Sequence, residues 1–106
     1  ASAQVGRAAD AVEILLRALD LARRTGDAPG EARWLASIGE ALWRFGQPED
    51  AGRALNDALV LSRKLDDVEL QANLLTLLGR LHVARGQTPR ARECLNRALD
   101  LNRRLG

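Results

Sequence analysis

The side chains of this 106-residue sequence that could act as nucleophiles, proton acceptors or metal ligands are few and scattered. His82 is the only histidine and Cys94 the only cysteine, too few for the usual ligand set of a zinc site. No serine or threonine stands in a nucleophile elbow, and no glycine pattern matches a phosphate-binding loop. We therefore expect no catalytic residue, no metal and no cofactor, and we interpret the protein as a non-enzyme.

The overall composition is that of a folded, soluble protein. Apolar residues make up 46% of the chain, and no run approaches the roughly 18 apolar residues of a membrane span. The 16 basic and 14 acidic residues leave a net charge of +2, without the clustered charge typical of nucleic-acid binding. A single cysteine excludes an internal disulfide and favours a reducing compartment. We expect a cytoplasmic protein that binds neither nucleic acid nor membrane.

The first residues contain neither an initiator Met nor the basic and apolar order of a signal peptide. Alanine, leucine and arginine are abundant throughout, as is typical of GC-rich bacterial coding. These features favour a piece of a longer bacterial protein.

The sequence contains an internal repeat, because it matches itself when it is shifted by 40 residues, as from Asp27 to Asp67. This repeat determines where the side chains described above lie in the fold. Residues 27–66 then align with residues 67–106, and residues 1–26 align with the second half of either unit. Identical residues recur along the whole unit: Gly39 with Gly79, Gly46 with Gly86, Ala51 with Ala91, Leu55 with Leu95, and Ala58 with Ala98. We interpret residues 1–106 as one domain that holds half a repeat and two complete repeats.

Each complete repeat is predicted to form two helices. Leu35, Ile38, Leu42 and Phe45 recur at steps of three or four residues, which is the period of one face of a helix and excludes a strand. The predicted helices span residues 8–25, 28–45, 48–65, 68–85 and 88–104.

The expected ends of these helices carry recognisable signals. Gly46 tolerates the left-handed conformation that ends a helix, and Pro48 favours the first turn of the next one. Asp27 and Asp67 are predicted N-caps of the first helix in each repeat.

Two repeated glycines, Gly39 and Gly79, fall in the middle of predicted helices, where glycine costs about 1 kcal/mol relative to alanine. A close helix crossing would compensate for this cost, with Leu55 and Leu95 filling the space between the paired helices. Each pair retains apolar surface that stacking against the next pair would bury.

The stretches "LASIGEAL" with "FGQPEDAGRALNDAL", and "LLTLLGRLHVARGQTPRARECLNRAL", resemble the tetratricopeptide repeat family over essentially the whole chain. This resemblance implies an all-α fold, a right-handed α-α superhelix of about five antiparallel helices. The usual period is about 34 residues. The longer period here resembles the long variety found in kinesin light chains, cell-polarity adaptors and the helical sensor domains of bacterial transcription activators.

The repeat alignment also suggests structural roles for the two reactive residue types. His82 aligns with Leu42, which favours a packing histidine over a ligand or a base. Cys94 aligns with Ala54, which favours an inert packed thiol.

The resemblance implies that the first helices of the repeats line a concave groove. On that face we place six candidate peptide-binding residues: Arg33, Glu40, Trp43, Asn73, Thr76 and Arg80. Trp43 could anchor a peptide or be buried in helix packing, and the charged positions could instead form a solvated face. Trp34, which aligns with Leu74, is expected to pack against the preceding helix.

Two functions follow from this interpretation. The first is a non-catalytic protein-interaction module that binds a peptide or a partner domain in the groove, as part of a larger bacterial signalling or regulatory protein. The alternative is a structural segment that forms homo-oligomers through its terminal helices, since uncapped repeat ends expose apolar surface. The residues expected to drive self-association are Leu95, Leu99, Leu101 and Leu105.

Overall fold

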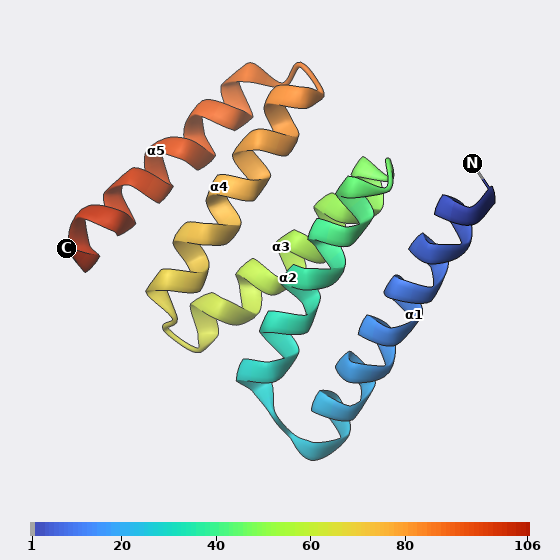
Figure 1. Ribbon diagram of the computed structural model, residues 1–106. Coiled ribbons are helices and arrows are strands. Elements are labelled where there is room, and N and C mark those ends of the chain that lie inside the picture. Colours follow the sequence, from blue (N-terminus) through green and yellow to red (C-terminus); the bar gives the residue numbers. More distant parts are fainter. Residues whose placement is uncertain (1) are drawn as a thin grey trace.

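The computed structural model describes the backbone of residues 2–106 and the side chains of residues 9–106. This part of the chain forms five helices and no strand, which confirms the predicted all-α solenoid (Figure 1). The helices are α1 (Ser2–Thr25), α2 (Ala28–Arg44), α3 (Pro48–Lys64), α4 (Val68–Ala84) and α5 (Thr88–Leu105).

The predicted boundaries of α2 to α5 are correct to within one residue, whereas α1 begins at Ser2 instead of residue 8. The predicted start agrees with the alignment of residues 1–26 with the second half of a repeat, in which Gly6 falls on the turn residue Gly46. Position 8, however, is an alanine where the next repeat has Pro48, so no residue starts a new helix there. The helix therefore continues through Gly6.

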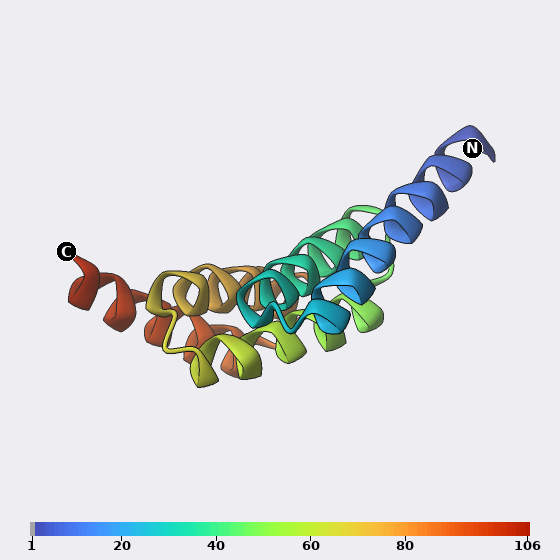
Figure 2. The same cartoon turned by 90° about the horizontal axis from the view of Figure 1, so that it is seen from below.

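Helices α2 to α5 are arranged in two layers. Figure 2 shows α2 and α4 in one layer and α3 and α5 in the other. Each helix packs against the next one along the chain, and α2 also contacts α4 directly within their shared layer. The face shared by α2 and α4 is therefore formed by successive repeats.

The connections between helices use the predicted turn chemistry. Gly46, with φ of 77°, follows α2, and the N–H of Gln47 donates to the carbonyl oxygen of Leu42 at 2.8 Å. This pattern closes the helix with a left-handed residue. Both predicted N-caps are confirmed: Asp27 Oδ1 accepts from the N–H of Gly30 at 3.0 Å, and Asp67 Oδ1 accepts from the N–H of Leu70 at 3.1 Å.

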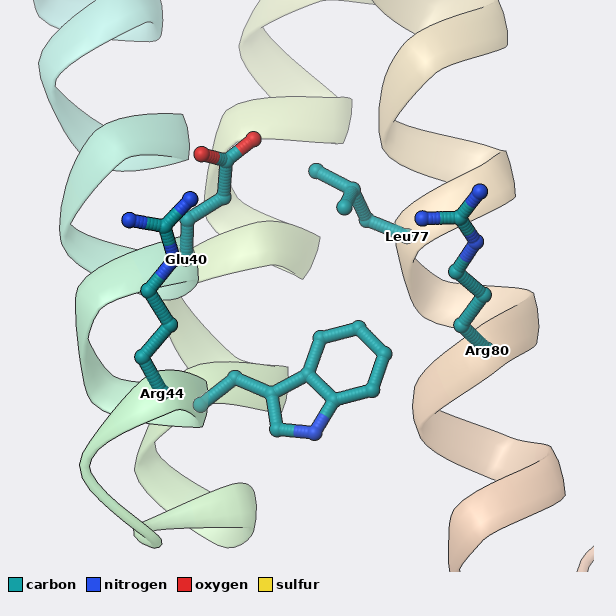
Figure 3. Close-up of a pocket in the computed structure, with 5 residues that line it drawn as sticks. Glu40, Arg44, Leu77 and Arg80 are labelled. Atoms are coloured by element: carbon teal, nitrogen blue, oxygen red, sulfur yellow. The ribbon is translucent and has the colours of Figure 1, made fainter.

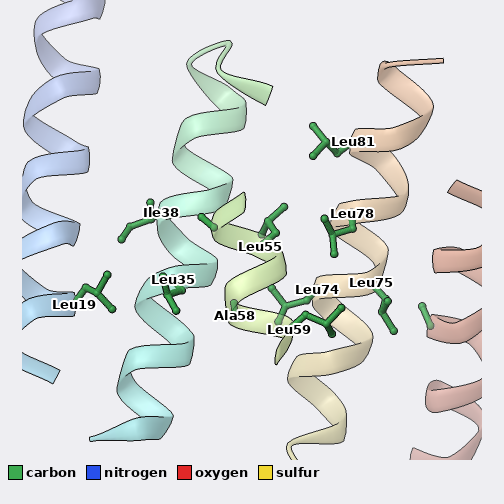
Figure 4. Close-up of a cluster of buried hydrophobic side chains, with 12 residues drawn as sticks. Leu19, Leu35, Ile38, Leu55, Ala58, Leu59, Leu74, Leu75, Leu78 and Leu81 are labelled. Carbon is green, nitrogen blue, oxygen red and sulfur yellow. The ribbon is translucent and has the colours of Figure 1, made fainter. Parts of the chain in front are cut away.

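The core consists mainly of leucines from α1 to α4, and α5 contributes Ala98 to it (Figure 4). The two mid-helix glycines lie at close crossings, as predicted. A Cβ atom on Gly79 would lie 2.7 Å from Cδ2 of Leu95, and the equivalent crossing joins Gly39 to Leu55. These contacts fix how closely α2 approaches α3 and α4 approaches α5.

Candidate functional site

An open pocket of about 320 Å³ lies between α2 and α4, at their C-terminal halves. Glu40, Trp43 and Arg44 line it from α2, and Leu77 and Arg80 line it from α4 (Figure 3). In that view Leu77 points from α4 toward α2, and Arg44 extends along the same wall as Glu40. Each wall of the pocket therefore belongs to a different repeat.

The apolar part of the pocket is held by the core. Trp43 and Leu77 are half-buried and pack against the buried leucine cluster. The sequence left open whether Trp43 is available to a ligand or is buried in helix packing. In the structure it both packs against the core and lines the pocket. A side chain held in this way loses little further rotamer freedom when a ligand covers it.

The charged part of the pocket is exposed. Glu40, Arg44 and Arg80 are all open to solvent, and within residues 9–106 none of them forms an ion pair. Two arginines against one glutamate give the pocket a formal charge of +1. Guanidinium groups with free donors can bind carboxylates through paired hydrogen bonds.

Three of the six predicted groove residues lie outside this pocket. Arg33 and Asn73 are exposed but occupy the N-terminal halves of α2 and α4. Arg33 precedes Arg44 by 11 residues, which corresponds to about 16 Å along the helix axis. Thr76 is half-buried, and its hydroxyl donates to the carbonyl oxygen of Ala72 at 2.9 Å, so its proton is already engaged.

Two pocket residues were missed by the sequence analysis. Arg44 lies one helical turn after Glu40, so following the α2 stripe by one more turn would have found it. Leu77 lies one turn before Arg80 but reads as another core leucine. Only the placement of α2 beside α4 turns that leucine toward a surface site.

His82 and Cys94 lie outside the pocket lining. Nδ1 of His82 lies 2.8 Å from Oε1 of Gln87, so the ring joins the end of α4 to the N-cap residue of α5. Burial raises the pKa of the half-buried Cys94 thiol, and the carboxylate of Glu93 raises it further. Both arrangements agree with structural roles.

Some apolar side chains are more exposed than their repeat positions suggest. Trp34 is 38% exposed, although the equivalent Leu74 is fully buried, so Trp34 is packed less completely than its repeat position suggests. The difference in exposure arises because α4 packs against two preceding helices, α2 and α3, whereas α2 packs against only one preceding helix, α1. In α5, Leu99 and Leu105 are exposed, while Leu95 and Leu101 are half-buried and turned toward the protein.

Comparison with protein families accounts for this arrangement of paired helices. The tetratricopeptide repeat model matches residues 2–64 and, in a second overlapping match, residues 38–104. The chain belongs to the tetratricopeptide repeat family. A comparison with curated proteins gave no match. Tetratricopeptide repeats form non-catalytic scaffolds for protein–protein interaction, and that general role applies to this chain.

No helix in the described part of the chain is long and apolar enough to cross a membrane. The described residues also contain no group of three or more side chains suited to hold a metal ion.

Proposed function

We propose that this chain is a non-catalytic interaction module that binds a peptide segment of a partner protein in the pocket between α2 and α4. The observation that carries this proposal is the composition of the pocket, where half-buried Trp43 and Leu77 lie beside arginines that have no ion-pair partner within residues 9–106. Aromatic and arginine side chains are the residue types that contribute most to protein interfaces.

The size and shape of the pocket favour a peptide over a small metabolite. A volume of about 320 Å³ is at the lower end for a small-molecule site, and the pocket is open to solvent. One large side chain of a peptide would fill it while the rest of the peptide lay across the α2–α4 face. Arg33, Asn73 and Thr76 would then contact flanking residues further along α2 and α4.

In the wider protein, this module would serve a bacterial signalling or regulatory role in the cytoplasm. Residues 27–66 and 67–106 would be its two complete repeats of the long variety, and residues 1–26 the second helix of another. The family's role in protein–protein interaction supports an interaction module. The bacterial role, the location in the cytoplasm and the bounds of the repeats are part of the proposal.

Titration of ¹⁵N-labelled protein with a library of short peptides blocked at both termini tests the proposal. We expect some library members to shift the indole N–H signal of Trp43 while leaving that of Trp34 unchanged, since Trp34 is outside the pocket lining. Arg80→Ala should weaken binding by about two- to fivefold. Arg92→Ala, which removes an exposed arginine of α5 away from the α2–α4 face, is the matched control. A library without any peptide that moves the Trp43 signal would contradict the proposal.

A second candidate function, self-assembly through α5, is favoured by one comparison between repeats. Leu59 of α3, against which α4 packs, is 6% exposed, whereas the equivalent Leu99 of α5 is 54% exposed. A second copy that covered α5 would remove this apolar surface from water. Leu105 would contribute at the edge of that contact, whereas Leu95 and Leu101 would act mainly by supporting the helix.

Light scattering coupled to size exclusion over a concentration series tests self-assembly. We expect the unmodified chain to form dimers or larger species, and the double variant Leu99→Glu, Leu105→Glu to be a folded monomer. Val60→Glu, at an equally exposed position on α3, is the control and should leave assembly unchanged. A monodisperse monomer of the unmodified chain at high concentration would rule out this second function.

A further inference from the structure

We infer that the partner segment carries a bulky apolar side chain next to an acidic residue, and that this acidic residue pairs with Arg80. The inference rests on the proposed function, because it names the chemistry of the peptide that the pocket between α2 and α4 would hold.

The two walls of the pocket differ in charge at equivalent positions. Glu40 of α2 and Arg80 of α4 are 40 residues apart and correspond to each other in successive repeats. The same backbone position therefore presents a carboxylate on one wall and a guanidinium on the other. A ligand that spans the pocket meets opposite charges at its two sides, which favours one orientation.

Arg80 is the arginine that is free to bind an external carboxylate. Arg44 lies four residues after Glu40 on the same helix, a spacing at which opposite charges attract, so a carboxylate close by on the same wall partly offsets its positive charge. On α4, by contrast, the only acidic residue is Glu69, 11 residues before Arg80 and about 16 Å away along the axis. The positive charge of the α4 wall is therefore uncompensated on its own helix.

The apolar anchor is inferred from Trp43 and Leu77. Both side chains are half-buried against the core and also line the pocket, so each presents apolar surface that a ligand could remove from water. Leu77 precedes Arg80 by three residues, one turn along α4. An apolar side chain that contacts Leu77 would consequently place a neighbouring residue of the peptide beside Arg80.

Four short synthetic peptides, blocked at both termini so that no free carboxylate is present, test the inference. They carry a central leucine with aspartate, lysine or serine on both sides, or a central serine with aspartate on both sides. Binding is followed by the Trp43 indole signal, with Trp34 as internal reference. We expect the leucine peptide with aspartates to bind about two- to fivefold more tightly than its serine-flanked counterpart, and the lysine version to bind most weakly.

Charge reversal identifies the residue that pairs with the acid. In Arg80→Glu we expect the preference to switch, so that the lysine-flanked peptide binds more tightly than the aspartate-flanked one. Arg92→Glu changes the net charge of the protein equally, but this residue lies on α5, away from the α2–α4 face, and its replacement should leave the order of the peptides unchanged. A reversed order in both variants would mean that overall charge, not Arg80, sets the preference, and would overturn the inference.

The outcomes separate this inference from the proposed function. If the unrestricted peptide library yields ligands that move the Trp43 signal but lack acidic residues, the inferred chemistry is wrong and the peptide-binding function stands. Equal binding of the aspartate and lysine peptides would likewise overturn the inferred chemistry and leave the peptide-binding function in place. If no peptide moves the Trp43 signal even at about 5 mM, a concentration above a millimolar Kd, both the inference and the proposed function are overturned.

Discussion

Gly39 of α2 lies directly against the side chain of Leu55 on α3, so closely that a Cβ atom on Gly39 would lie 2.6 Å from both Cγ and Cδ2 of that leucine. Leu55 is completely buried, and the carbonyl oxygen of Ala51 would lie 3.3 Å from the same Cβ. A Cβ atom at position 39 would thus require the buried side chain of Leu55 or the helix backbones to shift.

Gly39→Ala should destabilise the protein, even though alanine is the better helix former. The gain in helix propensity is about 1 kcal/mol, and we expect the clash with Leu55 to outweigh it, leaving a net loss of about 1–2 kcal/mol. Chemical denaturation followed by circular dichroism measures this change. Leu55→Ala provides the space, so the double variant should be more stable than the sum of the two single effects predicts. If the effects of the two substitutions on the free energy of unfolding were strictly additive, this would contradict a direct contact between positions 39 and 55.

Asp66→Gly should stabilise the protein. Asp66 has φ of 55°, in the left-handed region, where the equivalent residue of the preceding repeat is Gly26 with φ of 71°. A side chain in this conformation is strained, so glycine should raise the free energy of unfolding by about 0.5–1 kcal/mol. Asp66→Ala, which keeps a Cβ atom, is the control and should give no such gain in denaturant midpoint.

Asp67→Ala should cost about 1 kcal/mol of stability, because the substitution removes the cap of α4. The N–H of Leu70 would lose its acceptor at the start of that helix. Gln47→Ala is a matched control at the start of α3, where the side chain makes no capping hydrogen bond, and it should change stability little. Similar thermal midpoints for the two variants would show that the Asp67 cap contributes nothing.

The Cys94 thiol should react slowly with iodoacetamide at neutral pH. Burial raises its pKa, with a smaller contribution from Glu93, and only the thiolate is nucleophilic. The rate should therefore rise with pH and reach half its maximum above the ordinary pKa of a cysteine. Unfolded protein in denaturant, in which burial is lost, should react at the ordinary midpoint and serves as the reference.

The same shift predicts a loss of stability in alkaline solution. Below the ordinary pKa the thiol is neutral in both the folded and unfolded chain, so its contribution to stability is fully present. As the pH rises, the unfolded chain ionises first, and stability falls until the pH passes the raised pKa of the folded state. Cys94→Ala, which introduces the residue found at the equivalent Ala54, should remove this part of the pH dependence. An unchanged alkaline profile in that variant would contradict a raised pKa.

Much of the fold was predictable because its signals are local. The spacing of Leu35, Ile38 and Leu42, the turn glycine Gly46 and the cap Asp27 each act within a few residues, and the structure contains the predicted helices α2 to α5. The start of α1 was mispredicted because residues 1–26 were aligned with the second half of a repeat, although position 8 lacks the proline found at position 48.

The candidate site was only partly predictable, because it lies between helices of different repeats. Of the six residues placed in a groove by the family resemblance, Glu40, Trp43 and Arg80 line the pocket. Arg33, Asn73 and Thr76 share their stripe but lie outside the pocket lining. A stripe on a helix extends along its whole length, while the pocket occupies only the part where the side chains of α2 and α4 converge.

The sequence by itself determined the helices, their ends, the repeat and the close glycine crossings, since these depend on backbone preferences and on the volumes of side chains paired by the repeat. Only the tertiary structure decided that Leu77 and Trp43 line the same pocket, that Trp34 is exposed where Leu74 is buried, and that Glu40 and Arg80 lie on opposite walls of that pocket. The physical reason is that exposure and electrostatic environment depend on which helices lie beside a residue. Two residues at equivalent positions of successive repeats therefore differ in exposure and electrostatic environment whenever the helices beside them differ.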